Sequence, residues 1–154
     1  MRFGRDRRGA SIALTHVLTV GITAVLISGL LVGMSGMVDD QRERSIRTSL
    51  ETIGERLTTE LTYVDEMSPR AAGITLEVEH PRTVAGRIYR VQLTTDPGIC
   101  GAGLTCLRLH TDSPDVTVVV SMRLDASVAE ATVSGGDLRI VYDGDITLVE
   151  GEGT

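Results

Sequence analysis

The chain has 154 residues, enough for one ordinary domain with a tail or an anchor but not for two full domains. It carries 15 basic and 21 acidic residues, a net charge of −6, and only 3% of its residues are aromatic. Nucleic-acid binding normally requires clustered cations for the phosphates or aromatic rings for the bases. The composition therefore argues against a nucleic-acid partner, and the apolar content of 42% argues against global disorder.

An uncharged apolar segment follows the basic N-terminus. Residues 10–38 contain no Asp, Glu or Arg, whereas residues 1–9 carry four Arg against one Asp. About 20 apolar residues in a helix are enough to cross a bilayer. The basic flank predicts a single-pass helix with a cytoplasmic N-terminus, so that the acidic remainder of the chain lies outside the cell.

Small and hydroxyl residues recur within this apolar segment. Three threonines are spaced four residues apart on one helix face, and two glycines form a G-x-x-x-G pattern. One interpretation is a helix–helix packing face; the other is that the hydroxyls bond their own i−4 carbonyls. A single His16 near the cytoplasmic edge receives no assigned role. The positions expected to pack against neighbours are Leu14, Thr15, Leu18, Thr19, Thr23, Val25, Gly29 and Gly33.

Residues 39–67 predict an amphipathic continuation of the same helix. Apolar side chains recur there at spacings of three and four residues, as on one stripe of a helix. Pro69 disfavours helix at the residue before it, so one helix is expected from about Ala10 to Glu66. The stripe must pack either on the C-terminal domain or on neighbouring subunits. It consists of Ile46, Leu50, Ile53, Leu57, Leu61 and Val64.

From Ala71 onward the apolar pattern changes to period two. Turn signals such as Asp96-Pro97-Gly98 and Gly135-Gly136 separate short runs rich in β-branched residues. The expected fold class is α+β, with a long helix followed by a small antiparallel sheet or sandwich over residues 71–150 and a tail at 151–154. The expected strands are Ile74–Glu79, Arg87–Thr94, Leu107–Thr111, Val116–Leu124, Ser127–Val133, Leu138–Tyr142 and Ile146–Val149.

The two cysteines, Cys100 and Cys106, lie in one short Gly-containing segment. In an oxidising external compartment this spacing favours a disulfide that closes the loop. A zinc site would need two more ligands, with His80 or His110 converging on the pair. A redox site would usually show C-x-x-C. We expect a disulfide and no metal.

Catalytic signatures are missing from the sequence. It contains no G-x-S-x-G, no H-E-x-x-H and no Gly-rich phosphate loop before a helix. The acidic turns at 112–115 and 143–145 are expected to be solvated. We therefore predict no enzymatic activity, no cofactor and no small-molecule substrate.

The arrangement around Arg7-Arg8-Gly9 resembles that of an archaeal type IV prepilin. These residues directly precede Ala10 and the apolar segment, which passes into an amphipathic helix and then a β head. The resemblance implies that a prepilin peptidase cuts between Gly9 and Ala10 and removes residues 1–9 as a leader. Residues 10–38 would then form the transmembrane and filament-core helix. The implied partners are the peptidase, other pilin-like subunits, the pilus assembly machinery and membrane lipid.

Two departures from the pilin pattern refine this resemblance. Bacterial pilins usually carry Glu at the fifth mature position, where this chain has Leu14, and many haloarchaeal adhesion pilins have a Ser-Pro stretch where this chain has Ser11-Ile12. These differences favour a minor or divergent archaeal pilin-like protein. The acid-rich, Lys-free composition resembles that of halophilic archaea, whose carboxylate surfaces stay hydrated when salt screens their repulsion.

Two alternatives remain for the N-terminal segment. An uncleaved signal anchor would hold an extracellular β-sandwich binding module that resembles an archaellum stator component. A cleaved secretory signal peptide fits less well, because the apolar run exceeds the usual 7–15 residues and no A-x-A site closes it.

Overall fold

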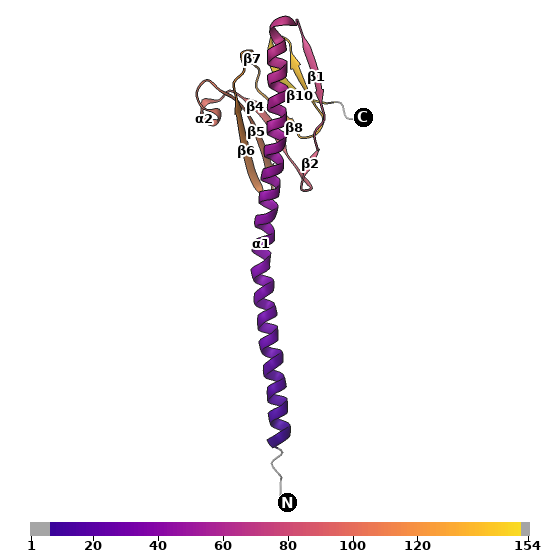
Figure 1. Ribbon diagram of the computed structural model, residues 1–154, viewed down its shortest axis with the longest axis vertical. Coiled ribbons are helices and arrows are strands. Elements are labelled where there is room, and N and C mark those ends of the chain that lie inside the picture. Colours follow the sequence, from indigo (N-terminus) through magenta and orange to yellow (C-terminus); the bar gives the residue numbers. More distant parts are fainter. Residues whose placement is uncertain (1–6, 152–154) are drawn as a thin grey trace, which may run out of the picture. The chain divides into compact units, whose positions relative to one another are not determined.

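A computed structural model describes the backbone of residues 7–151 and the side chains of residues 13–33 and 37–151. In the described part of the chain, helix α1 (Arg7–Met67) comes first and ten strands follow it, so the predicted α+β class with a long helix and a β head is confirmed (Figure 1). The chain divides into two compact units, Met1–Gln41 and Arg42–Thr154, and the division falls within α1. Among the described residues, the first unit holds the beginning of α1 alone, and the second holds the rest of α1 and the strands.

The end of α1 follows from local chemistry. A short 3₁₀ turn, η1 (Ser68–Arg70), succeeds the helix and has Pro69 in its first turn. The Ser68 hydroxyl donates to the Asp65 carbonyl oxygen over 2.8 Å, which satisfies one of the carbonyls left open at the helix end. The predicted end at Glu66 differs from the observed one by a single residue.

The strands form two four-stranded sheets and one small hairpin. The first sheet has the order β1-β9-β10-β7, the second has the order β6-β5-β4-β8, and β2 pairs with β3 alone. In the view of Figure 1, β5 and β6 lie on one side of α1 and β1 on the other. The strand bounds are β1 Ile74–Val78, β2 Thr83–Val84, β3 Arg87–Ile88, β4 Arg90–Thr94, β5 Thr105–Asp112, β6 Asp115–Met122, β7 Ser127–Val128, β8 Ala131–Ser134, β9 Leu138–Tyr142 and β10 Asp145–Glu150.

The core of the second unit is built from the helix stripe and both sheets. All six stripe residues of α1 are buried there, together with alternating residues of the strands. This settles the choice left open by the sequence, since the chain's own sheets cover the stripe. The strand residues with no exposed surface are Val91, Leu93, Cys106, Leu107, Leu109, Thr111, Val116, Ile140 and Ile146.

Gly54 marks the place where the second sheet comes closest to the helix. A Cβ atom at this position would lie 2.8 Å from Val120 Cγ2 and 3.1 Å from Leu109 Cδ1. A glycine within a helix costs about 1 kcal/mol relative to alanine. Because glycine has no side chain, the sheet can pack directly against the helix here. This close packing explains why a residue with low helix propensity occupies the position.

Two predicted strands are each divided in the structure. The expected strand Arg87–Thr94 breaks at Tyr89 into β3 and β4, because β3 turns back to pair with β2. The hairpin turn uses Ala85 and Gly86, both at positive φ. A two-residue turn of this kind favours Asn or Gly at both positions. Because Ala85 occupies the first position, the sequence does not show the usual signal for this hairpin.

The expected strand Ser127–Val133 divides between the two sheets. Residues Ser127–Val128 form β7, which pairs with β10 in parallel, whereas β8 pairs with β4 in the second sheet. The prediction of purely antiparallel pairing is therefore wrong for this one short pair. A further helical turn, α2 (Pro97–Cys100), was also not predicted, although Asp96 caps it and Pro97 occupies its first turn, as is typical of helix starts.

Candidate functional site: the apolar helix and the surface of the β domain

The first unit exposes an apolar helix surface. Every described side chain from residue 13 to residue 33 is exposed, including Leu14 at 66% and Val25 at 72%. Over this part of the chain α1 is long and apolar enough to cross a membrane. Burying one Leu or Val side chain is worth about 1.5–3 kcal/mol. Such a surface is stable only when lipid or other protein covers it.

The hydroxyl groups of this helix bond to their own backbone. Thr19 donates to the Thr15 carbonyl oxygen, Thr23 to that of Thr19, and Ser28 to that of Ala24, each over 2.8 Å. These bonds satisfy the hydroxyl donors without a partner helix, as one of the two interpretations of the threonine row required. They do not prevent the same face from packing against another helix.

The glycines and apolar residues of the predicted packing face are exposed as well. A Cβ added at Gly29 or Gly33 would meet no atom within 4 Å. The packing of Leu14, Leu18 and Val25 against neighbours stays a prediction, because a single chain offers them none.

The predicted cleavage site lies at the beginning of α1. The helix starts at Arg7, so the Gly9–Ala10 bond belongs to its first turn. Residues 1–6 of the predicted leader lie outside the described residues, and so do the side chains of Arg7, Arg8 and Ala10 around Gly9. Processing at this bond stays a prediction.

The packing residues named from the sequence thus separate into two groups. Those from Leu14 to Gly33 are exposed in the first unit, where they are available to partners. The other four are buried in the second unit under the chain's own sheets, and none is exposed by more than 6%. These are Ile46, Leu50, Ile53 and Leu57.

Asp65 is a structural residue that the sequence analysis missed. Its side chain is buried at 8% exposure and accepts hydrogen bonds from the backbone N–H groups of Asp125 and Ala126, at distances of 2.8 to 3.2 Å. The carboxylate therefore ties the end of α1 to the segment between β6 and β7. The sequence hints at this role only through the position of Asp65 directly after the stripe residue Val64, which places it at the edge of the buried helix face.

His80 and Tyr89 are two further buried residues that each make a polar contact. His80 Nε2 lies 3.3 Å from Glu60 Oε2, and burial lowers the His80 pKa although Glu60 opposes the shift. The Tyr89 hydroxyl donates to the Pro81 carbonyl oxygen over 2.8 Å, and burial raises the pKa of Tyr89 to about 12. Both residues are therefore mainly neutral near pH 7 and join the β1–β2 segment to the core.

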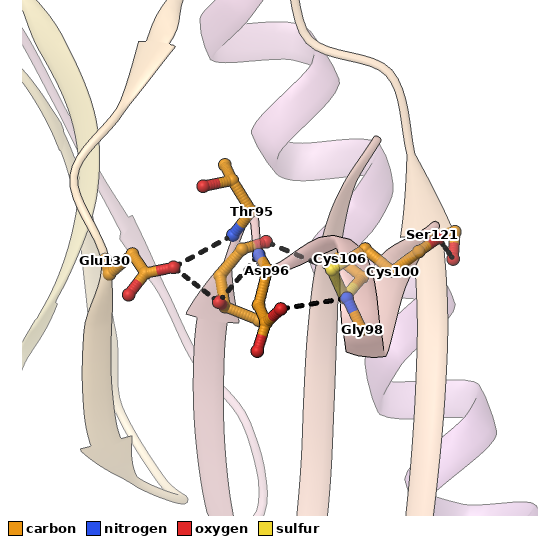
Figure 2. Close-up of a disulfide and its surroundings, with 8 residues drawn as sticks. Thr95, Asp96, Gly98, Cys100, Cys106, Ser121 and Glu130 are labelled. Carbon is orange, nitrogen blue, oxygen red and sulfur yellow. Dashed lines mark hydrogen bonds between the residues drawn. A yellow bond between two sulfur atoms is a disulfide. The ribbon is translucent and has the colours of Figure 1, made fainter. Parts of the chain in front are cut away.

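The predicted disulfide between Cys100 and Cys106 is confirmed. Their Cα atoms are 5.4 Å apart, and the bond closes the loop from α2 to β5 (Figure 2). Among the residues that the structure describes, no group of three or more His, Cys, Asp or Glu could hold a metal ion.

Hydrogen bonds to the segment between β7 and β8 support this loop. Glu130 accepts from the Thr94 hydroxyl over 2.5 Å and from the Thr95 N–H over 3.2 Å, and these bonds lower the Glu130 pKa. Asp96 accepts from the Gly98 N–H at the start of α2. Figure 2 shows these contacts next to the disulfide. They hold the loop in place and bring no reactive pair together.

A cleft of about 550 Å³ lies beside α1 and strands β1 and β9. Its charged lining includes both signs, with Arg56 and Glu60 only 3.2 Å apart. None of the described residues that line it is Ser, Thr, Cys or His. Its described lining therefore offers no hydroxyl or thiol nucleophile and no histidine base.

The model of a family described as a family of unknown function, DUF7266, matches residues 5–150. The chain belongs to this family. The DUF7266 match begins before the apolar part of α1 and ends with β10, so it includes the exposed helix and the β domain together. No curated protein and no solved structure is significantly similar to the chain.

Proposed function

We propose that this chain is a structural subunit of an archaeal type IV pilus-like surface filament. In this proposal the apolar part of α1 first anchors the protein in the cell membrane. The β domain lies outside the cell, and residues 1–9 are removed by a prepilin peptidase. The subunit then leaves the lipid and packs through its helix among other pilin-like subunits.

The observation that carries this proposal is the contrast within α1. Residues 13–33 are exposed on all sides, whereas the stripe from Ile46 to Val64 is fully used within the β domain. A helix of this kind needs an external apolar partner only for its first part. Lipid supplies that partner before assembly, and the same part of other subunits supplies it afterwards.

The motif before the apolar segment supports the pilin form of the proposal over a permanent anchor. Arg7-Arg8-Gly9 stands immediately before the apolar segment, where a prepilin peptidase would cut. The Lys-free, acidic composition supports a halophilic archaeal source, and the loop disulfide suits an oxidising exterior.

The proposal is tested by the intact mass of the protein isolated from its native membranes. We expect a mass without residues 1–9 for the natural chain. A Gly9→Val variant should stay at full length, because a bulky residue replaces the small one before the scissile bond. The matched control is Gly4→Val, which makes the same change earlier in the leader and should be processed normally.

An unprocessed N-terminus in the natural chain would contradict this proposal. The result would favour a permanently anchored extracellular binding module that keeps its basic N-terminus in the cytoplasm. Loss of processing in both glycine variants would show a general defect of the leader and would not locate the cut at Gly9.

A further inference from the structure

A shallow hollow of about 320 Å³ lies on the outer face of the second sheet. Strands β4, β5 and β8 contribute all of its lining, and every lining side chain is polar. This volume lies at the lower end of small-molecule sites, which measure about 300–1,000 Å³. The lining residues are Arg90, Gln92, Arg108, His110 and Thr132.

The strand register places three of these side chains in one row. Gln92 on β4 pairs directly with Arg108 on β5 and with Thr132 on β8. Opposite residues of neighbouring strands have Cβ atoms about 4.5–5.5 Å apart. Their sequence neighbours Val91, Leu107 and Val133 are buried on the other face. The pairing of β4 with β5 and β8 therefore places one guanidinium, one amide and one hydroxyl side by side on this face of the sheet.

Arg108 differs from the other cation of the hollow. Arg90 donates to both carboxylate oxygens of Asp112, at 2.6 and 2.8 Å, and His110 Nε2 lies 3.0 Å from the same carboxylate. Arg108 is partly buried, and among the residues that the structure describes its guanidinium has neither a hydrogen-bond partner nor a carboxylate within 4 Å.

The neutral members of the row are similarly available. Within the described part of the chain the side chains of Gln92 and Thr132 form no hydrogen bond. A guanidinium presents N–H groups in a planar fork that matches a carboxylate, while an amide and a hydroxyl can each donate and accept. The row thus combines one unneutralised positive charge with two neutral groups suited to hydroxyls.

We propose that this hollow binds a carboxylate-bearing sugar. The Arg108 guanidinium donates to the carboxylate of the sugar, and Gln92 and Thr132 exchange hydrogen bonds with its hydroxyls. A ligand with a single negative charge fits, because Asp112 and Asp115 lie within 4 Å of the lining residue His110 and the chain carries a net charge of −6. The two carboxylates and the negative net charge of the chain would repel a polyanion.

This site is independent of the proposed filament assembly. All of its residues lie in the unit Arg42–Thr154, and none belongs to the exposed apolar helix. A failure of prepilin processing would leave the sugar site unaffected, and a failure of sugar binding would leave the filament proposal unaffected.

The test is a titration of the full-length protein in a sugar-free detergent, followed by the backbone amide signals of β4, β5 and β8. We expect galacturonate to give saturable shifts centred on Gln92, Arg108 and Thr132, with a Kd of about 1 mM. Arg108→Gln should raise this Kd about tenfold or more, because it removes a charge-assisted pair. The Kd of Arg108→Lys should lie between those of the natural protein and of Arg108→Gln, since lysine keeps the charge but lacks the planar guanidinium.

The matched control is Arg87→Gln, which removes an exposed arginine on β3 outside the hollow and should leave the Kd unchanged. Galactose should bind about tenfold more weakly than galacturonate, because it lacks the carboxylate. Inorganic sulfate should also bind more weakly, because Asp112 and Asp115 repel its two negative charges and because it cannot donate a hydrogen bond to Gln92 or Thr132 as a sugar hydroxyl does.

Three outcomes would overturn the proposal. These are no saturable shift with galacturonate, an unchanged Kd in Arg108→Gln, and sulfate binding as tight as that of galacturonate. The last would show an anion site without preference for a sugar. If Arg108→Gln failed to fold, the double variant Gln92→Ala/Thr132→Ala would serve instead, with an expected loss of galacturonate affinity and little change in sulfate affinity.

Discussion

The two parts of α1 are equally helical but bury their apolar residues differently. From residue 13 to residue 33 apolar side chains occur all round the helix, and every described one is exposed. From Ile46 to Val64 they are confined to one stripe, and the β domain covers that stripe. The distribution of apolar residues around a helix, and not their number, therefore indicates whether its partner lies inside or outside the chain.

The largest effect is expected from a cavity under the helix stripe. Leu57→Ala should lower the free energy of unfolding of the β domain by about 2–5 kcal/mol, because a fully buried leucine is truncated. Leu18→Ala makes the same change on the exposed part of α1 and should change this free energy by less than about 0.5 kcal/mol. The hydrogen exchange rates of the β5 amides in the full-length protein measure the change in unfolding free energy for both variants. Equal effects of the two variants would contradict the comparison.

A smaller loss is expected where the stripe meets the β6–β7 segment. Asp65→Ala leaves the Asp125 and Ala126 N–H groups without their acceptor, and each unsatisfied buried group costs about 1–3 kcal/mol. We expect a total near 2 kcal/mol, because water can reach part of this segment. Glu66→Ala, at the exposed neighbouring position, is the control. Faster amide exchange confined to residues 123–128 would identify the lost bonds as the cause.

Removing the disulfide should have a comparable or slightly smaller effect. Cys100→Ser combined with Cys106→Ser opens a short loop, for which chain entropy predicts a loss of about 2 kcal/mol. The change should be visible in the thermal unfolding of the β domain, whereas membrane residence of the apolar helix should not change. A defect in membrane residence would show that the loop contributes to more than the stability of the head.

The smallest expected effect is a dependence on pH. Burial lowers the His80 pKa in the folded state below its usual value of 6.5, so the unfolded state binds a proton more readily between the two pKa values. Stability should therefore be complete above pH 6.5 and fall as the pH drops below it, until the folded pKa is passed. His80→Gln should remove this dependence, whereas His110→Gln should retain it. Equal acid sensitivity in the natural chain and in His80→Gln would contradict this assignment.

The sequence was most informative where one periodicity dominates. The helix bounds, the stripe, most strands and the Cys100–Cys106 bond could all be predicted from spacing, because each depends on residues close together in the chain. The hairpin at Ala85–Gly86 could not, since an alanine at positive φ gives no turn signal. The split of Ser127–Val133 between two sheets is decided by long-range pairing, which local pattern does not encode.

The surface features were the least predictable. Asp65 accepts hydrogen bonds from backbone groups some sixty residues away, and the adjacent sequence does not indicate those partners. The row of Gln92, Arg108 and Thr132 depends on the register of three strands that are not all consecutive in sequence. Single residues of these types on strands normally indicate only a solvated face.

The most direct test of the central claim is oxidative cross-linking of Val25→Cys in intact cells, followed by analysis of filaments sheared from the surface. Our account predicts cross-linked multimers in the sheared fraction, because the exposed part of α1 packs against the same part of other subunits. Thr59→Cys, exposed on the second part of the helix, is the matched control and should give far fewer cross-links. A chain that stays in the membrane fraction, with Val25→Cys uncross-linked, would contradict filament assembly.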